Sequence, residues 1–180
     1  MRERPNIPPA ALINTAADLV IGVSAGLAAA LIMSLFQSAV TRMGLQSQPR
    51  KTAAMKAADA ISQEVAGASL KPRYKQKADL LLHYLTGAAA GGIYGLFGRL
   101  VPALRAGQGL LYGGLVWAMA DEGLVPALGL SAPANRKGLG EHGFALSSHL
   151  VYGAALDIVR RRMNRMVAGG RVNGDPSEGD

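Results

Sequence analysis

The feature that most constrains this chain is a run of 23 residues, Leu19 to Thr41, that contains no Asp, Glu, Lys or Arg. A second run of this kind, Leu80 to Gly98, has 19 residues. A helix needs about 20 apolar residues to cross a hydrocarbon core of roughly 30 Å. The two runs therefore predict two membrane-spanning helices. A soluble bundle with buried Gly- and Ala-rich helices is the weaker interpretation.

A third apolar stretch, Gly107 to Leu130, carries two adjacent carboxylates well inside it, Asp121 and Glu122. A charged side chain is expensive in hydrocarbon, so these groups must face protein or water, or the helix must end there. A fourth run, Gly143 to Leu156, is shorter, but its flanks extend the expected helix from Glu141 to Met163. The sequence therefore predicts an all-α, polytopic integral membrane protein with four transmembrane helices.

The alternative has three transmembrane helices plus a re-entrant segment between Arg99 and Glu141. With four spans, Lys and Arg divide almost equally between the two sides of the membrane, so the positive-inside rule has no preference. With three spans, most of the basic residues lie on one side. The length of Ala106 to Leu130 and the ease of an antiparallel hairpin favour four spans, which require both termini on the same side.

The remaining segments differ in character from the apolar runs. We expect residues 1–13, with their three prolines, to be a disordered lead-in, and residues 168–180 to be a disordered tail. The membrane helix bundle then occupies residues 14–167. Within it, residues 42–77 are predicted to be a basic amphipathic loop with a short helix, which either lies at the lipid headgroups or only links two spans.

Basic side chains beside the apolar runs are expected to contact the lipid bilayer. The net charge is +7, but only 5% of the residues are aromatic, and the basic residues flank apolar segments instead of forming a nucleic-acid motif. The predicted partners are therefore anionic headgroups, without nucleic acid. The headgroup contacts are assigned to Arg50, Lys51, Lys71, Arg73, Lys75, Lys77, Arg160, Arg161 and Arg162.

Small residues recur at four-residue spacing, which puts them on one helix face and lets two membrane helices approach closely. Glycine also follows tyrosine at Tyr94, Tyr112 and Tyr152. We interpret the glycine stripes as packing within one bundle, with a dimer interface as the alternative. The residues assigned to helix packing are Gly22, Gly26, Gly87, Gly91, Gly95, Gly113 and Gly153.

Acids and histidines are expected at similar depth in the third and fourth spans. Asp121 lies about eight residues before the end of one span and His149 about eight residues into the next, or roughly 12 Å from the same surface. A histidine and a carboxylate at matching depth can share a proton, or can satisfy each other structurally. The candidate buried polar cluster comprises His83, Asp121, Glu122, His149 and Tyr152.

Other chemistries find less support. The chain has no Cys. His142 and His149 are seven residues apart, or about 10 Å along a helix, which is too far for one metal ion. The sequence contains no phosphate-binding loop and no nucleophile elbow. We therefore predict no metal, no cofactor and no catalytic residues.

From Gly107 onward the chain resembles the YagU-like family of small bacterial inner-membrane proteins of unknown biochemical function. Three pieces carry the resemblance, GQGLLYGGLVWAM, LVPALGLSAP and EHGFALSSHLVYGAALDIVRRRMNRM. The resemblance implies a cytoplasmic-membrane protein of a few helices and supplies no catalytic residues. The family pattern has few acids in the third apolar segment, so Asp121 and Glu122 depart from it.

Taken together, these features predict a small, non-enzymatic, multi-pass protein of the bacterial cytoplasmic membrane with a structural or stress-related task. The alternative is a proton- or solute-handling membrane protein that uses the buried Asp121, Glu122 and His149. In that alternative we expect a homo-oligomer, because four short helices enclose little space.

Overall fold

The computed structural model describes residues 9–46, 52–98, 100–130 and 138–172, with side chains described from Thr15 to Val167 within those ranges. Every regular element in these ranges is helical. Two helices, α1 (Pro9–Arg42) and α3 (Pro72–Phe97), are long and apolar enough to cross a membrane. They contain the first uncharged run and all but the last residue of the second, so the all-α class and the helical length of both runs are confirmed.

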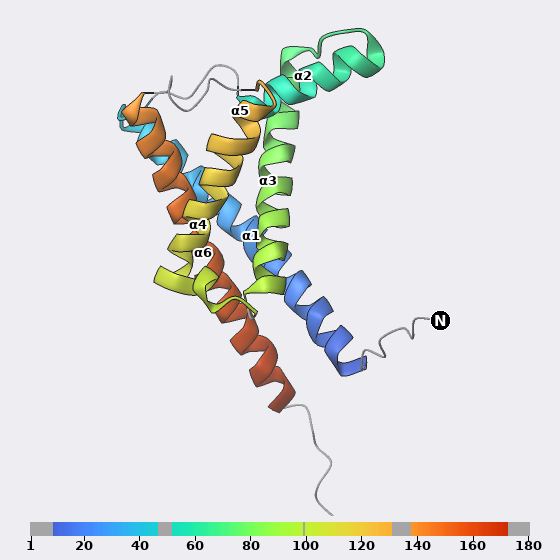
Figure 1. Cartoon of the computed structure of the whole chain (residues 1–180), viewed down its shortest axis with the longest axis vertical. Helices are drawn as coiled ribbons and strands as arrows, with labels where there is room; N and C mark the ends of the chain where they lie inside the picture. Colours follow the sequence, from blue (N-terminus) through green and yellow to red (C-terminus); the bar gives the residue numbers. More distant parts are fainter. Residues whose placement is uncertain (1–8, 47–51, 99, 131–137, 173–180) are drawn as a thin grey trace, which may run out of the picture.

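The long helical segments alternate in direction along one bundle (Figure 1). Figure 1 shows the start of α1 and the end of the last helix at one end of the bundle, and α2 at the other end. The elements besides α1 and α3 are α2 (Ala53–Ala66), η1 (Pro102–Gly109), α4 (Leu110–Trp117), η2 (Ala118–Leu124), α5 (Val125–Ala127) and α6 (Leu139–Val172). The last turn of α4 continues through η2 into α5, so these three form one helical run.

The third and fourth predicted spans are helical, but neither has an unbroken apolar stretch as long as those of α1 and α3. By length and composition, the described part of the chain contains two helices able to cross a membrane, where the sequence predicted four. The third run is divided by η2, a π-helical segment that carries Asp121 and Glu122. α6 carries polar side chains along its length, including Ser148 and Asp157.

Both terminal helices extend beyond the limits that the sequence predicted. α1 begins at Pro9 instead of near Asn14, and α6 continues to Val172. Proline is tolerated in the first turn of a helix, because the N–H it lacks would have no partner there. The rest of the expected lead-in and tail, residues 1–8 and 173–180, lies outside the described residues.

α1 and α3 cross with their backbones in contact. A Cβ atom at Gly26 would lie 2.3 Å from the carbonyl oxygen of Gly87, and one at Gly91 would lie 2.4 Å from that of Gly22. These distances are well below a van der Waals contact, so neither position has room for a side chain. Gly95 is buried in the same contact. The glycine stripe of the second run thus packs within this chain.

A second glycine contact joins α4 to α6. A Cβ atom at Gly113 would lie 2.2 Å from the carbonyl oxygen of His149, and one at Gly153 would lie 2.3 Å from that of Gly109. Gly109 precedes α4 with a φ of 87°, a conformation that glycine adopts without strain. The bundle therefore consists of two closely packed pairs, α1 with α3 and α4 with α6, and α6 also packs on α1.

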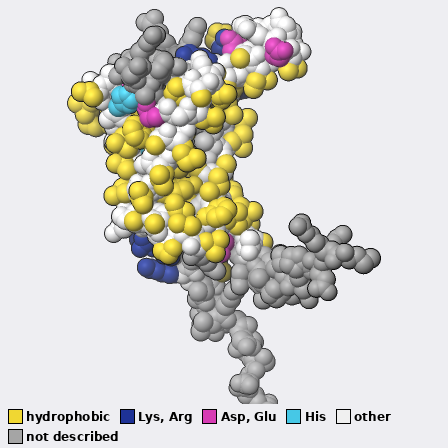
Figure 2. All heavy atoms as spheres, in the orientation of Figure 1, with side chains coloured by type: hydrophobic (Ala, Val, Ile, Leu, Met, Phe, Trp, Pro, Cys, Tyr) yellow, Lys and Arg dark blue, Asp and Glu magenta, His cyan; other side chains and the backbone are white. Residues whose placement is uncertain are grey.

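Alanines and three tyrosines make up most of the buried hydrophobic cluster, and most large aliphatic side chains face outward. Figure 2 shows the apolar side chains as a broad band over the middle of the molecule, with Lys and Arg near its ends. A water-soluble bundle has the reverse arrangement, with its large apolar residues inside. The buried hydrophobic cluster contains Ala25, Ala29, Ala30, Met33, Tyr94, Tyr112, Tyr152, Ala155 and Leu156.

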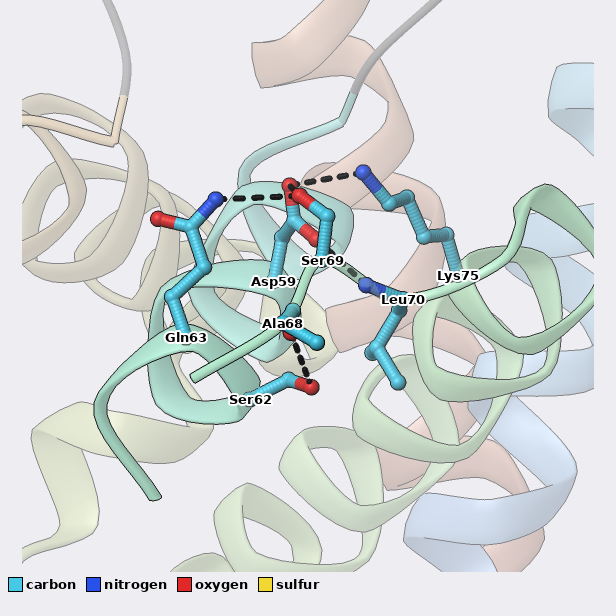
Figure 3. A network of polar contacts seen from close by, with 7 residues as sticks. All are labelled: Asp59, Ser62, Gln63, Ala68, Ser69, Leu70 and Lys75. Carbon is cyan, nitrogen blue, oxygen red and sulfur yellow. Dashed lines mark hydrogen bonds and ion pairs between the residues drawn. The ribbon is translucent and has the colours of Figure 1, made fainter. Parts of the chain in front are cut away.

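α2 projects sideways from the bundle and is tied to the start of α3 by a polar network (Figure 3). Asp59 accepts hydrogen bonds from Lys75 Nζ at 2.6 Å and from the N–H of Leu70 at 2.9 Å. Ser69 donates to the same carboxylate. The Lys75 ammonium holds the pKa of Asp59 below its usual range, so the carboxylate stays charged at neutral pH. This network positions α2 although none of the residues of α2 is buried.

Replacing Gly91 by Leu is expected to push α1 and α3 apart, because the new side chain would begin where the backbone of Gly22 and Gly26 already lies. Overpacking a close contact destabilises a protein by about 1–3 kcal/mol or more. The measurement is the midpoint of thermal unfolding in detergent micelles. Ala89→Leu is the matched control, since it adds the same side chain at an exposed position on the same helix. Equal midpoints for the two variants would contradict the close-contact account.

Candidate functional site

The two carboxylates of the third helical run lie on η2 and face α6. The helix continues through Asp121 and Glu122 instead of ending there. Pro126 cannot donate to the carbonyl of Glu122, four residues earlier, and in an α-helix its ring would crowd that carbonyl. The wider π-helical turn relieves this crowding. Such turns are frequent at functional sites.

Each carboxylate meets a histidine of α6. Asp121 Oδ2 lies 3.7 Å from Nδ1 of His149, and Glu122 Oε1 lies 3.1 Å from Nδ1 of His142. The sequence predicted that Asp121 and His149 share a depth, and the structure brings them together. It did not predict a role for His142. The sequence did contain a signal for this role. His142 and His149 are seven residues apart and so lie on one face of α6 at two depths, where each can meet a different carboxylate.

The ring of His149 also contacts its own helix. Its Nδ1 lies 3.0 Å from the carbonyl oxygen of Ala145. A carbonyl oxygen only accepts, so Nδ1 carries a proton and donates to it. At 3.7 Å from the same nitrogen, the Asp121 carboxylate is a neighbouring charge rather than the acceptor of a second short hydrogen bond.

Two other members of the predicted cluster lie elsewhere. On α3, His83 faces α1, where its Nε2 lies 3.0 Å from Ser34 Oγ and 3.2 Å from the carbonyl oxygen of Ala30. On α6, the Tyr152 hydroxyl donates to the carbonyl oxygen of Gly87 at 2.7 Å. The five predicted residues therefore do not form one cluster. A shared depth does not bring side chains together when they leave different faces of their helices.

Three tyrosine hydroxyls connect the two helix pairs. Tyr112 on α4 donates to the carbonyl oxygen of Ala90 on α3 at 2.6 Å, and Tyr94 on α3 donates to Asp157 Oδ1 on α6 at 2.8 Å. Tyr152 makes the third connection, from α6 to α3. In each Tyr-Gly pair, the glycine makes the backbone contact within one helix pair and the tyrosine reaches the other pair. The recurring dipeptide therefore has one structural cause.

A second polar group lies at the opposite end of the bundle, where α1 begins and α6 ends. Arg160 on α6 is only 2% exposed. Its Nη2 lies 3.8 Å from Asp18 Oδ1 on α1 and 3.4 Å from the carbonyl oxygen of Gly95 on α3. The guanidinium also lies over the ring of Tyr94, 5.7 Å from its centroid. One side chain thus holds three helices together.

Asp157 completes this group. It is fully buried, accepts the hydrogen bond from Tyr94, and pairs with Arg161 one turn further along α6. We call Asp18, Tyr94, Asp157, Arg160 and Arg161 the buried charge network. A buried charge is tolerated only when it is paired and hydrogen-bonded, as these residues are.

The position of Arg160 corrects the sequence prediction, which placed it at the lipid headgroups because it follows an apolar run. Helical spacing puts it on the same buried face as Leu156 and Gly153. Asp18 was missed too, although it lies four residues before Gly22 and so on the close-packing stripe of α1. The helical spacing of Arg160 from Leu156, and of Asp18 from Gly22, could have indicated in the sequence that both side chains are buried.

The other residues assigned to headgroups have varied surroundings. Arg161 is bound to Asp157 and Lys75 to Asp59. Arg50 and Lys51 lie outside the described residues. The exposed ones are Lys71, Arg73, Lys77 and Arg162.

Within the described part of the chain, no group of three or more His, Asp or Glu residues is placed to hold a metal ion. Comparisons with known protein families, with curated proteins and with solved structures gave no match. What the structure defines is therefore a class, an all-helical protein with two helices able to cross a membrane.

Replacing Arg160 by Met is expected to destabilise the protein by about 3–5 kcal/mol, because Asp18 would lose a charged partner inside the bundle. Arg162→Met removes the same charge from an exposed position two residues away and should have little effect. Thermal unfolding of both variants in the same detergent is the measurement. The buried charge network would have no stabilising role if the two variants unfolded together.

Proposed function

We propose that this chain is a four-span integral protein of the bacterial cytoplasmic membrane with a structural, non-enzymatic role. The observation that carries the proposal is the inverted distribution of side chains, with large apolar residues outside and small or polar ones inside. Of the most apolar 18-residue stretch of α1, only 39% is buried, and of the corresponding stretch of α3, only 33%. A core helix of a soluble protein is mostly buried, so hydrocarbon suits these exposed faces better than water.

The run from Leu110 to Ala127 favours a span over a re-entrant segment. At 1.5 Å per residue it is about 27 Å long, close to the thickness of a hydrocarbon core. It extends beside α6 without turning back to the end where it began (Figure 1). Its carboxylates meet His142 and His149, and such pairing reduces the cost of placing them at depth.

α6 supports a fourth span although it is less apolar than α1 and α3. The polar residues in the middle of α6 are turned inward and bonded there. Ser148 is buried and donates to the carbonyl oxygen of Phe144, Tyr152 donates to α3, and Asp157 accepts from Tyr94. Part of the low apolarity of α6 thus comes from residues that a lipid would not touch.

α2 fits a position along the headgroups. Ile61 and Val65 on its apolar face are 64% and 81% exposed, and Lys56 is exposed on another face. A helix with one apolar and one charged face lies in the plane of the membrane surface. The exposed Lys71 and Arg73 at the start of α3 belong to the same surface.

The structural role is supported by what the buried polar side chains do. The hydroxyls of Tyr112 and Tyr152 bond backbone carbonyls of a neighbouring helix, as does the ring of His83. The location in the cytoplasmic membrane rests on the resemblance of the C-terminal part to the YagU-like family. The start of α1 and the end of α6 lie at one end of the bundle, as an even number of spans requires.

Two measurements test this proposal. The protein should stay in the membrane fraction after washing with alkaline carbonate, because burial of apolar surface is not screened as charge attraction is. Reporters fused before Met1 and after Asp180 should be found in the same compartment. Recovery in the soluble fraction would end the membrane assignment, and opposite compartments would reject four spans.

A second candidate function, proton transfer, is favoured by the two carboxylate–histidine contacts. Both contacts are partly buried and join the third helical run to α6, and His142 and His149 lie about 10 Å apart along α6. Histidine changes its charge near neutral pH, so each pair can pass or hold a proton. This candidate requires an oligomer or a local opening that lets water reach the contacts.

In sealed vesicles with a pH-sensitive dye inside, the wild-type protein should then dissipate an imposed pH gradient. Asp121→Asn should reduce the rate to that of empty vesicles, because the amide cannot carry the proton. Glu64→Gln, on the exposed surface of α2, should leave the rate unchanged. Equal rates for empty and protein-containing vesicles would reject proton transfer and leave the contacts as packing.

A further inference from the structure

The end of the bundle opposite α2 has an open hollow of about 190 Å³ with a basic lining. Its walls are Gln108, Ile158, Arg161, Arg162 and Arg165. On a helix, positions 158, 161, 162 and 165 form one stripe, so a single face of α6 supplies the apolar residue and all three arginines. Figure 2 shows Lys and Arg side chains gathered below the apolar band at this end.

The arginines have unused hydrogen-bonding capacity. Arg161 uses one end of its guanidinium for Asp157, while its Nε is buried and has no partner among the described residues. Neither Arg162 nor Arg165 has an ion pair within the described part of the chain, and both are exposed. A guanidinium donates in a planar fork that matches two oxygens of a phosphate. The lining therefore suits a phosphate group, whose oxygens can accept hydrogen bonds from more than one guanidinium.

The opposite wall of the hollow is held in a strained conformation. Gln108 is the one non-glycine residue of the described chain with a positive φ, 57°, and it lies between Gly107 and Gly109. Strained residues persist where the surrounding structure requires them, and they concentrate at ligand sites. Here the turn carries the Gln108 amide, a hydrogen-bond donor, to the rim of an arginine-lined hollow.

An apolar seam runs from the hollow toward the middle of the bundle. Ile158 lines the hollow and is 47% exposed, and Leu110, which follows the turn on α4, is 42% exposed. Further along, the Leu150 side chain lies 4.0 Å from where a Cβ atom of Gly114 would be. The seam thus follows the contact between α4 and α6 in the direction that acyl chains take from a headgroup.

We propose that this hollow binds the phosphate of an anionic phospholipid, with its acyl chains along the seam between α4 and α6. The proposal rests on the membrane location argued above. A second hollow, beside α2, does not share this chemistry, because Asp59 lies with Lys56 and Lys75 in its lining. A phosphate meets only positive and neutral groups at the arginine stripe, and a lipid is favoured over free phosphate because the apolar seam begins at the same place.

The test is the thermal unfolding of the full-length protein in detergent micelles, titrated with phosphatidylglycerol, with phosphatidylcholine or with inorganic phosphate. Phosphatidylglycerol should raise the midpoint, and the other two should not. Arg162→Gln with Arg165→Gln should weaken the apparent affinity for phosphatidylglycerol about tenfold or more, as expected for lost hydrogen bonds between charged groups. Lys56→Gln with Lys71→Gln removes the same charge from exposed positions at the other end and should weaken the affinity far less, because these side chains meet headgroups only at the open surface.

Three outcomes would overturn the proposal. Equal weakening by both double variants would mean that only overall charge attracts the lipid. Stabilisation by inorganic phosphate that the arginine variant abolishes would assign the hollow to free phosphate instead. Carbonate extraction of the same variants separates this test from the proposed function. Variants that resist extraction but bind phosphatidylglycerol like the wild type would reject the lipid site alone, whereas a wild type that washes off would reject the membrane location itself.

Discussion

Backbone contact at glycine is the constraint on which the rest of this structure depends. Gly26 and Gly91 let α1 and α3 touch along their backbones, and Gly113 and Gly153 do the same for α4 and α6. At such a separation only small side chains fit between the helices of a pair, and four of the nine residues of the buried cluster are alanines. The close approach also brings backbone carbonyls of one pair within reach of tyrosines on the other.

Polar side chains occupy the interior because the close packing gives them partners. Tyr94, Asp157 and Arg160 lie in the bundle at one end, and the Asp121 and Glu122 contacts lie toward the other. Between these ends the helices meet through glycine, alanine and tyrosine. A lipid-facing bundle gains little from burying more leucine, since hydrocarbon already solvates it, so packing and internal hydrogen bonds must hold the helices together.

The arginines near the end of α6 show how one short segment serves two purposes. Arg160 points inward and joins three helices, whereas Arg162 and Arg165 point outward to the surface. Arg161 lies between these directions, with Asp157 on one side and the hollow on the other. A turn of helix that looks uniformly basic in the sequence therefore divides into a structural half and a surface half.

The sequence by itself determined where the apolar helices lie and which faces pack closely. Apolar run length and four-residue glycine spacing are local properties, so Leu19 to Thr41 and Gly91 could be interpreted without knowing any partner. Only the tertiary structure decided that Glu122 meets His142, that His83 faces α1, and that Arg160 is buried. Those outcomes depend on which face of each helix is turned toward which neighbour, and a periodic pattern does not contain the rotation of one helix relative to the next.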